Sequence, residues 1–162
     1  MKKLTLAALL LLGGITTTFA QANKKEYKVD PASVAATLKY LSSDELEGRL
    51  AGSTGLEKAA AYLEDILKKN DVKPYFKTYK DTLTNFDKPT YNIVGYLEGT
   101  DPVLKKEFLV LGAHYDHIGL TEDPTGGDNV YNGANDDASG TTTIAELVPV
   151  SYTHLRAHET DS

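Results

Sequence analysis

The sequence predicts an α/β fold with a mixed sheet, and three observations carry this prediction. Apolar residues recur at helical spacing over 31–42 and 54–69. Strand-like segments follow, and 108–113 is a continuous apolar run, which is typical of a strand buried on both faces of a sheet. That run leads into a polar loop and a further helix, so helices and strands alternate as they do in α/β domains.

Two helices are expected first. Asp30 suits the N-cap position and Pro31 the first helical position, so the first helix should begin there and end near Ser42. A turn and a loop separate it from the second helix. Thr54 and Glu57 have the spacing of a capping box at the start of that helix.

Strands come next. The alternation over 75–79 is weak and predicts an outer strand, whereas 91–97 has a stronger strand pattern between turn residues. The apolar run 108–113 is expected to be the buried central strand. A loop rich in Gly, Asp and Asn occupies 119–140, and 141–148 begins another helix.

The first 22 residues have the pattern of a secretory signal peptide: two lysines, an apolar stretch and small residues before a cleavage site near Ala20 or Ala22. The apolar stretch is shorter than the roughly 18 residues that a membrane span needs. We therefore expect a secreted or periplasmic protein whose folded part is 23–148.

The tail 149–162, PVSYTHLRAHETDS, resembles the in-frame translation of a transposase-type sequencing adapter. We therefore expect it to be non-native and the native sequence to run up to Val148. His154 and His158, followed by Glu159, offer an alternative helical metal pair, but the full H-E-x-x-H pattern is absent.

Composition excludes several classes of protein. The 162 residues suffice for one domain of ordinary size, and 17 Lys and Arg against 23 Asp and Glu give a net charge of −6. An acidic balance argues against nucleic acid or an anionic membrane as the main partner. The absence of cysteine excludes disulfides and thiolate metal ligands.

The first candidate site lies at the end of the predicted central strand, where ligands collect in open α/β sheets. His114 and Asp116 are two positions apart, so in extended backbone both side chains point to the same side. A neutral imidazole is a good zinc ligand, and a nearby carboxylate can hold its ring. A hydrogen-bonded core histidine would explain the same short motif equally well.

The second candidate site packs two carboxylates, Asp136 and Asp137, between Gly133 and Gly140. Glycine permits unusual backbone angles and close approach, and a carboxylate in such a loop can ligate a cation. The alternative is a solvated turn that caps the following helix, which would account for Asp137 and Ser139.

Together, the stretches 112–119 and 132–140 resemble the co-catalytic di-zinc aminopeptidases, the family of aminopeptidase Y and the bacterial leucine aminopeptidases. Upstream, 41–49 and 92–95 also resemble this family, so the resemblance extends over most of 31–148. It implies a three-layer α/β/α fold with a mixed, mostly parallel central sheet.

The resemblance also implies a role for individual residues. His114 would ligate one of two zinc ions, and Asp136 would bridge both. Asp116 would lie behind His114 and orient its ring. The family commonly has a cis peptide after the bridging aspartate, here between Asp136 and Asp137. His117 is frequent in this kind of motif, and no role is assigned to it.

Family members carry a glutamate general base and further ligands beyond these motifs, and none is found in this sequence. We therefore expect a truncated chain that is inactive as written. Two protein ligands are too few for a tight zinc site. Glu146, in the middle of a predicted helix, and Glu159 are no substitutes.

For the intact parent, the resemblance implies two zinc ions and hydrolysis of peptides at the free amino end. No nucleic-acid partner is expected, and no membrane contact after signal cleavage. One alternative is a glutaminyl cyclase-like transferase, which usually holds one zinc. The other is a non-catalytic binding module on the same fold.

Overall fold

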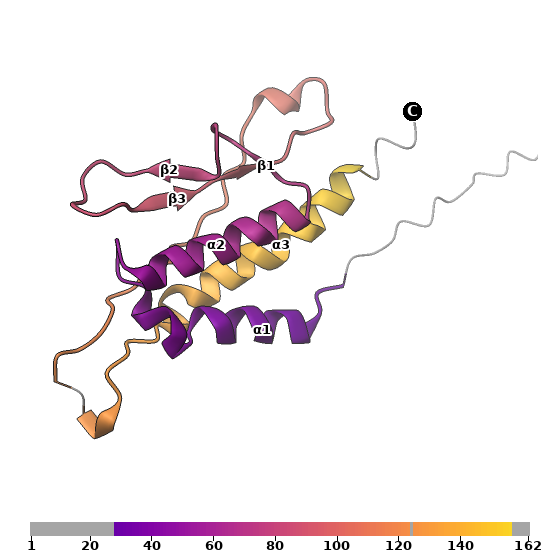
Figure 1. Cartoon of the computed structure of the whole chain (residues 1–162). Coiled ribbons are helices and arrows are strands. Elements are labelled where there is room, and N and C mark those ends of the chain that lie inside the picture. The colour runs from indigo at the N-terminus through magenta and orange to yellow at the C-terminus, as the bar shows by residue number, and fades with distance from the viewer. Residues whose placement is uncertain (1–27, 124, 157–162) are drawn as a thin grey trace, which may run out of the picture.

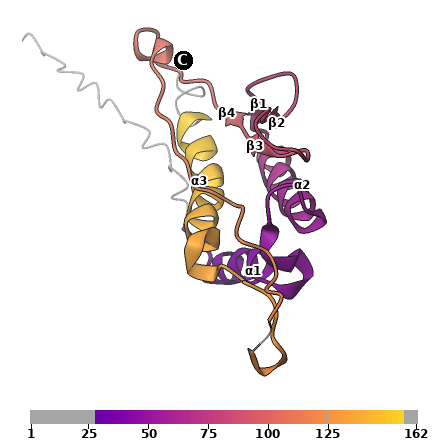
Figure 2. The same ribbon diagram turned by 90° about the vertical axis from the view of Figure 1, so that its left-hand side faces the viewer.

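The computed structural model describes residues 28–123 and 125–156 of the chain. The predicted signal peptide lies outside the described residues, as does the end of the tail. Within them, three α-helices are α1 (Pro31–Leu41), α2 (Thr54–Lys69) and α3 (Ser139–Arg156). A short 3-10 segment, η1 (Asp44–Arg49), connects α1 to α2. Figures 1 and 2 show α1 crossing below α2 and α3.

The first two helices confirm the predicted ranges. Asp30 caps α1, because its carboxylate accepts a hydrogen bond of 2.9 Å from the Ala32 amide. The capping box at Thr54 is wrong: Ser53 is the N-cap of α2, and its hydroxyl accepts from the Leu56 amide at 3.1 Å. Serine is preferred to threonine at an N-cap, and Ser53 has the extended backbone of that position. Glu57 instead forms an ion pair with Lys80.

The described strands are short and antiparallel: β1 (Lys73–Pro74), β2 (Lys80–Thr82), β3 (Tyr91–Ile93) and β4 (Gly95–Tyr96). They form two ladders, β1 with β4 and β2 with β3. Val94 joins the ladders, since its amide donates to the Tyr79 carbonyl and its carbonyl accepts from the Tyr75 amide. The predicted strand 91–97 is therefore largely confirmed.

The predicted outer strand 75–79 is wrong. Its neighbours Pro74 and Lys80 pair with Gly95 and Ile93, so Val94 alone faces the whole of 75–79. The segment must therefore bulge out of the ribbon instead of pairing residue by residue.

The predicted central strand 108–113 is also not formed: it has no ladder partner among the described residues. Its apolar side chains lie open to solvent, with Leu109 88% and Val110 84% exposed. A strand is buried on both faces only when neighbouring strands and covering helices enclose it, and the described ladders lie elsewhere in the chain. The described residues are α/β in content, with helices and small antiparallel sheets. They do not form the expected three-layer arrangement around a mostly parallel sheet.

The remaining described elements precede α3. They are the 3-10 turns η2 (Leu104–Lys106) and η3 (Thr125–Gly127) and the π-type turn η4 (Ala134–Ala138). The helix predicted from residue 141 is confirmed and begins slightly earlier, at Ser139. It continues through Pro149 to Arg156. The boundary at Val148 stays a prediction.

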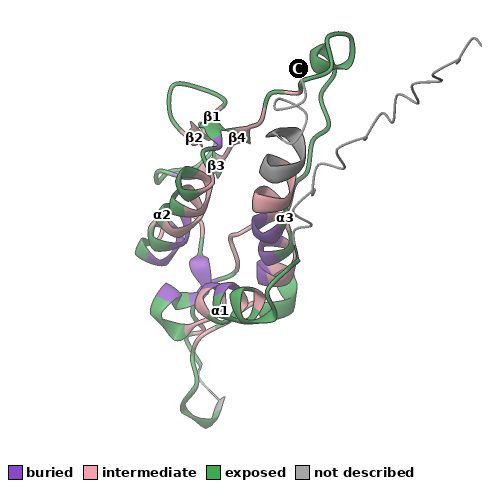
Figure 3. Cartoon of the chain, turned by 90° about the vertical axis from the view of Figure 1, so that its right-hand side faces the viewer, coloured by how far each residue is buried: buried purple, intermediate pink, exposed green. Residues whose placement is uncertain are grey.

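The core lies where α1, η1 and α2 meet the start of α3. Figure 3 shows the buried residues gathered there. Leu41, Leu46, Ala59 and Ala138 form its centre. Gly55 lets α2 approach η1 closely, because a Cβ on Gly55 would lie 1.8 Å from the Leu46 carbonyl oxygen. None of the described helices is long and apolar enough to span a bilayer.

Candidate metal centre

The segment that carries His114 is hydrogen-bonded to α3 and to β3. The His114 carbonyl accepts a hydrogen bond of 2.8 Å from the Thr141 hydroxyl at the start of α3. The Tyr115 hydroxyl donates to the Tyr91 carbonyl of β3 at 2.7 Å. Burial, followed by nearby carboxylates, raises the pKa of Tyr115 well above its usual value. The phenol therefore stays neutral and keeps donating this hydrogen bond.

The two ring nitrogens of His114 contact oxygens of different residues. Nδ1 lies 3.2 Å from the Asp116 carbonyl oxygen and 3.5 Å from the Asp116 carboxylate, while Nε2 lies 3.1 Å from Asp136 Oδ1. The structure thus brings together the three residues for which a role in the site was predicted. His117 approaches the same carboxylate less closely, with Nδ1 3.8 Å from Asp136 Oδ2.

The hydrogen-bond chemistry of His114 calls for a cation at Nε2. A carbonyl oxygen can only accept, so Nδ1 must carry a proton to bond the Asp116 carbonyl. In a neutral ring, Nε2 then presents a lone pair to the Asp136 carboxylate, which is repulsive unless a proton or a metal ion lies between them. The alternative prediction, a hydrogen-bonded core histidine, does not apply because the His114 side chain is 53% exposed.

When no metal ion is bound, the surroundings of His114 favour a proton at Nε2. Desolvation lowers the pKa of His114. The hydrogen bond to the Asp116 carbonyl and the charges of Asp116, Asp137 and Asp136 raise it by a larger amount. The net effect is a raised pKa. A proton therefore competes with any metal ion for Nε2.

The loop before α3 assigns different roles to the two neighbouring carboxylates. Asp137 Oδ1 accepts a hydrogen bond of 3.0 Å from the Gly140 amide, so the capping alternative holds for Asp137. Asp136 instead turns its carboxylate toward His114. The peptide bond between them is cis, as the family resemblance implied. Gly133 enters the turn with φ of 59°, a backbone angle that glycine adopts at little cost.

Arg49 contributes to this region, although no role for it was predicted from its residue type. Its side chain is fully buried, and its guanidinium donates hydrogen bonds to four carbonyl oxygens. These belong to Leu41, Tyr115, Asn132 and Gly133. The family-like stretch 41–49 ends at this residue, but its partners are backbone atoms, which every residue has, so the sequence did not reveal what the arginine contacts.

The described residues fit part of a zinc site and not a complete one. His114 and Asp136 offer a nitrogen and an oxygen donor that face each other. Within the described ranges, no group of three or more His, Asp or Glu side chains is placed to hold a metal ion. Glu146 lies elsewhere: it is buried, and its carboxylate accepts a hydrogen bond of 2.7 Å from the Ser33 hydroxyl.

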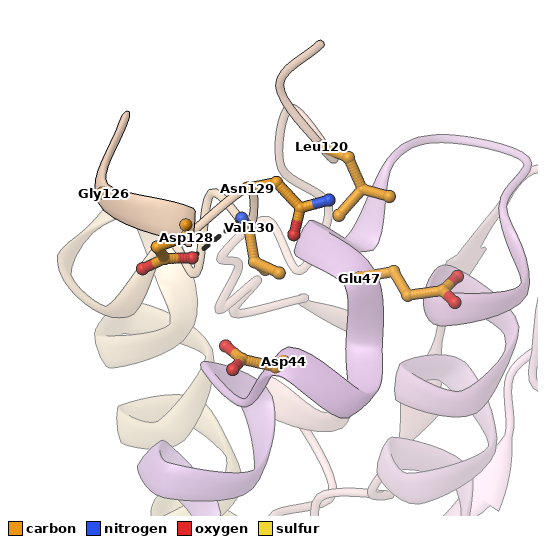
Figure 4. Close-up of a pocket in the computed structure, with 8 residues that line it drawn as sticks. Asp44, Glu47, Leu120, Gly126, Asp128, Asn129 and Val130 are labelled. Carbon is orange, nitrogen blue, oxygen red and sulfur yellow. Dashed lines mark hydrogen bonds between the residues drawn. The ribbon is translucent and has the colours of Figure 1, made fainter. Parts of the chain in front are cut away.

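An acidic hollow of about 600 Å³ lies between η1 and the loop that precedes Asn132 (Figure 4). Its lining includes Asp44, Glu47 and Asp128. The Asp44 carboxylate accepts a hydrogen bond of 2.7 Å from the Asn132 side-chain Nδ2, and the Asp128 carboxylate accepts one of 3.0 Å from the Val130 backbone amide. Oxygen donors without an imidazole are not the donor set that zinc prefers, so the hollow differs chemically from the His114–Asp136 pair.

Comparison with known proteins points to one family. The model of peptidase family M28 matches residues 92–158, a region that includes His114, Asp116 and Asp136. Comparisons with curated proteins and with solved structures gave no significant match. M28 is a family of zinc-dependent peptidases. The match, together with the convergence of His114 and Asp136, therefore supports a metallopeptidase.

Proposed function

We propose that residues 23–148 are part of a zinc-dependent aminopeptidase, which hydrolyses peptides at the free amino end. The observation that carries this proposal is the pairing of His114 Nε2 with Asp136 Oδ1 at 3.1 Å, with the opposite ring nitrogen held by Asp116. This pairing lies within the region that matches the M28 family.

Each residue has a role that follows from its contacts. His114 would donate Nε2 to one zinc ion, since Nδ1 is already engaged. Asp136 has two carboxylate oxygens, so it could bridge two ions. Asp116 positions the His114 ring and fixes its tautomer, as partners behind a metal-bound histidine do. Zinc, when bound, supplies a nucleophilic water and polarises the scissile carbonyl.

The chain by itself is proposed to bind zinc weakly and not to turn over substrate. A catalytic zinc takes three protein ligands, and the described residues bring two donors together. We further propose that the protein is exported, with signal cleavage near Ala20 or Ala22, and that 149–162 is a non-native tail. The acidic balance of the chain argues against a nucleic acid as its partner, and the proposed activity implies a peptide substrate.

Zinc titration of the full chain tests the site directly. The histidine ring signals in NMR report weak as well as tight binding. Because His154 and His158 could bind zinc on their own, both are replaced by glutamine in the reference protein for the titration, which is called the background. We expect zinc to shift the His114 signals in this background, and His114→Gln or Asp136→Asn to abolish the shift.

Asp128→Asn is the matched control. Asp128 is also an exposed loop carboxylate that accepts a backbone hydrogen bond, but it lines the acidic hollow. Zinc binding should survive this change. The proposal is wrong if His114→Gln and Asp136→Asn bind zinc as well as the unchanged background does.

A further inference from the structure

We propose that Arg49 is the positioning residue of this site, and that it sets the distance between His114 and Asp136. The inference rests on the proposed function, because it concerns the same pair of metal ligands. Arg49 lies upstream of residues 92–158, the region that matches the M28 family.

The backbone at Arg49 is joined to the segment that carries His114. The Arg49 carbonyl accepts a hydrogen bond of 3.0 Å from the His117 amide, and the Gly48 carbonyl accepts one of 3.0 Å from the Gly119 amide. Leu50 forms a parallel bridge with His117. The end of η1 therefore holds the backbone of this segment at His117 and Gly119, a few residues beyond His114.

The guanidinium connects that segment to the loop that carries Asp136. Nε donates to the Tyr115 carbonyl at 2.8 Å, and Tyr115 stands between His114 and Asp116. Nη1 donates to the Asn132 carbonyl at 2.7 Å and Nη2 to the Gly133 carbonyl at 3.0 Å. One rigid, planar group thus holds both ligand-bearing segments, and the separation of its nitrogens sets their spacing.

The Gly133 carbonyl extends this control to Asp136 itself. It also accepts a hydrogen bond of 3.2 Å from the Ala138 amide, so it closes the turn in which Asp136 lies. A Cβ on Gly133 would come within 2.7 Å of Arg49 Nη2, which shows how closely the guanidinium packs on this turn. A shift of the guanidinium would therefore move the turn and its carboxylate.

The buried charge of Arg49 distinguishes it from an ordinary structural side chain. Burying a cation is costly unless it is paired and hydrogen-bonded. No described carboxylate forms an ion pair with Arg49 to offset that cost. The charge is held instead by carbonyl oxygens. Burial lowers the pKa of Arg49, and the nearby charges of Asp116 and Asp136 offset this in part. The cation therefore lies where it opposes the repulsion between the carboxylates of the metal site.

Arg49→Lys and Arg49→Met test the proposal in the same zinc titration. Lysine keeps the charge but concentrates its donors at one point, so it cannot reach carbonyls on separate segments. We expect either change to weaken zinc binding at His114 about 10–100-fold, the range seen when partners behind metal ligands are removed. Far-UV circular dichroism and thermal melting show whether each variant is folded.

Thr37→Val is the control for a general loss of stability. Thr37 is buried, and its hydroxyl pairs with the Tyr62 hydroxyl at 3.1 Å between α1 and α2, with no contact to the site. This variant should melt at a lower temperature and bind zinc with unchanged affinity. A parallel loss of affinity in Thr37→Val would show that stability alone governs binding, and would overturn the proposal.

The remaining outcomes separate the two proposals. If the unchanged background does not bind zinc through His114, the proposed function fails. If it binds zinc and folded Arg49→Lys binds equally well, the positioning role is wrong while the proposed function stands. An osmolyte that strengthens burial can restore a marginal variant for titration. If neither variant folds even then, Arg49 is required for the fold itself, and the positioning role is overturned.

Discussion

The close approach of α2 to η1 allows a quantitative prediction for Gly55→Ala. A Cβ on Gly55 would lie 1.8 Å from the Leu46 carbonyl oxygen, whereas carbon and oxygen atoms in ordinary close contact are about 3.3 Å apart. The difference requires η1 to retreat by about 1.5 Å. Because Arg49 ends η1, the same movement would pull its guanidinium away from the Tyr115 and Asn132 carbonyls.

Two opposing terms set the size of the effect. Overpacking a buried contact costs about 1–3 kcal/mol. Alanine gains at most about 1 kcal/mol over glycine in a helix, and this gain is an upper limit because Gly55 lies in the first turn of α2. Because the atom met is a backbone oxygen that cannot rotate away, the cost should lie near the upper end of that range. We therefore expect a net loss of about 2–3 kcal/mol in the free energy of unfolding. In a domain of this size such a loss lowers the melting temperature by several degrees.

Urea unfolding followed by far-UV circular dichroism measures this loss. Zinc titration measures the zinc affinity, which should fall if Arg49 is displaced. Gly112→Ala is the matched control, because a Cβ at Gly112 would meet no atom within 4 Å. The control should change the free energy of unfolding by less than about 0.5 kcal/mol. A Gly55→Ala variant as stable as the unchanged chain would refute the packing of α2 on η1 described above.

Four further predictions concern single sites. Leu109→Lys should raise the monomeric fraction in size-exclusion chromatography, because Leu109 is 88% exposed on an unpaired apolar segment that favours self-association. Leu41→Ala should cost about 2–5 kcal/mol in urea unfolding, since Leu41 is fully buried in the core. Ser53→Ala should cost about 0.5–2 kcal/mol through loss of the α2 cap, measured in the same way. Without metal, the raised pKa of His114 means that the contacts of its protonated ring with the Asp116 carbonyl, and with the charges of Asp116, Asp137 and Asp136, stabilise the fold below the unfolded pKa of about 6.5. This stabilisation is lost as pH rises through the folded pKa. His114→Gln should therefore reduce stability more at about pH 5 than at about pH 8, and an equal loss at both would contradict this.

Local signals in the sequence predicted the helices well. Asp30 and Pro31 mark the start of α1 because capping and ring geometry act within a few residues. The displacement of the α2 cap from Thr54 to Ser53 shows the limit of such signals, since both residues can accept the same kind of hydrogen bond.

Long-range pairing could not be predicted in the same way. The apolar run 108–113 indicates a residue pattern suited to burial, but burial depends on strands that lie beside it in space. The bulge at 75–79 likewise follows from the register on either side of Val94 and not from its own sequence.

The candidate site was only partly predictable. His114 and Asp136 were expected to share a site, and the structure places them 3.1 Å apart. Asp137 was expected either to ligate a cation or to cap α3, and its contact with the Gly140 amide favours the cap. Their metal-binding roles stay predictions. The Arg49 cluster was missed because hydrogen bonds to backbone carbonyls leave no trace in residue identities.

The Arg49 hydrogen bonds have a consequence for how the site assembles. Arg49 and Asn132 are 83 positions apart in the chain, so the ligand pair acquires its spacing only after a long loop has closed. Closure of long loops costs little more at equilibrium than closure of short ones, about 0.6 kcal/mol for each doubling of length. It does slow folding, because contacts between distant positions form late. The site is therefore not a portable module: a segment grafted from 92–158 would carry His114 and Asp136 but lack the Arg49 guanidinium that contacts both of their segments.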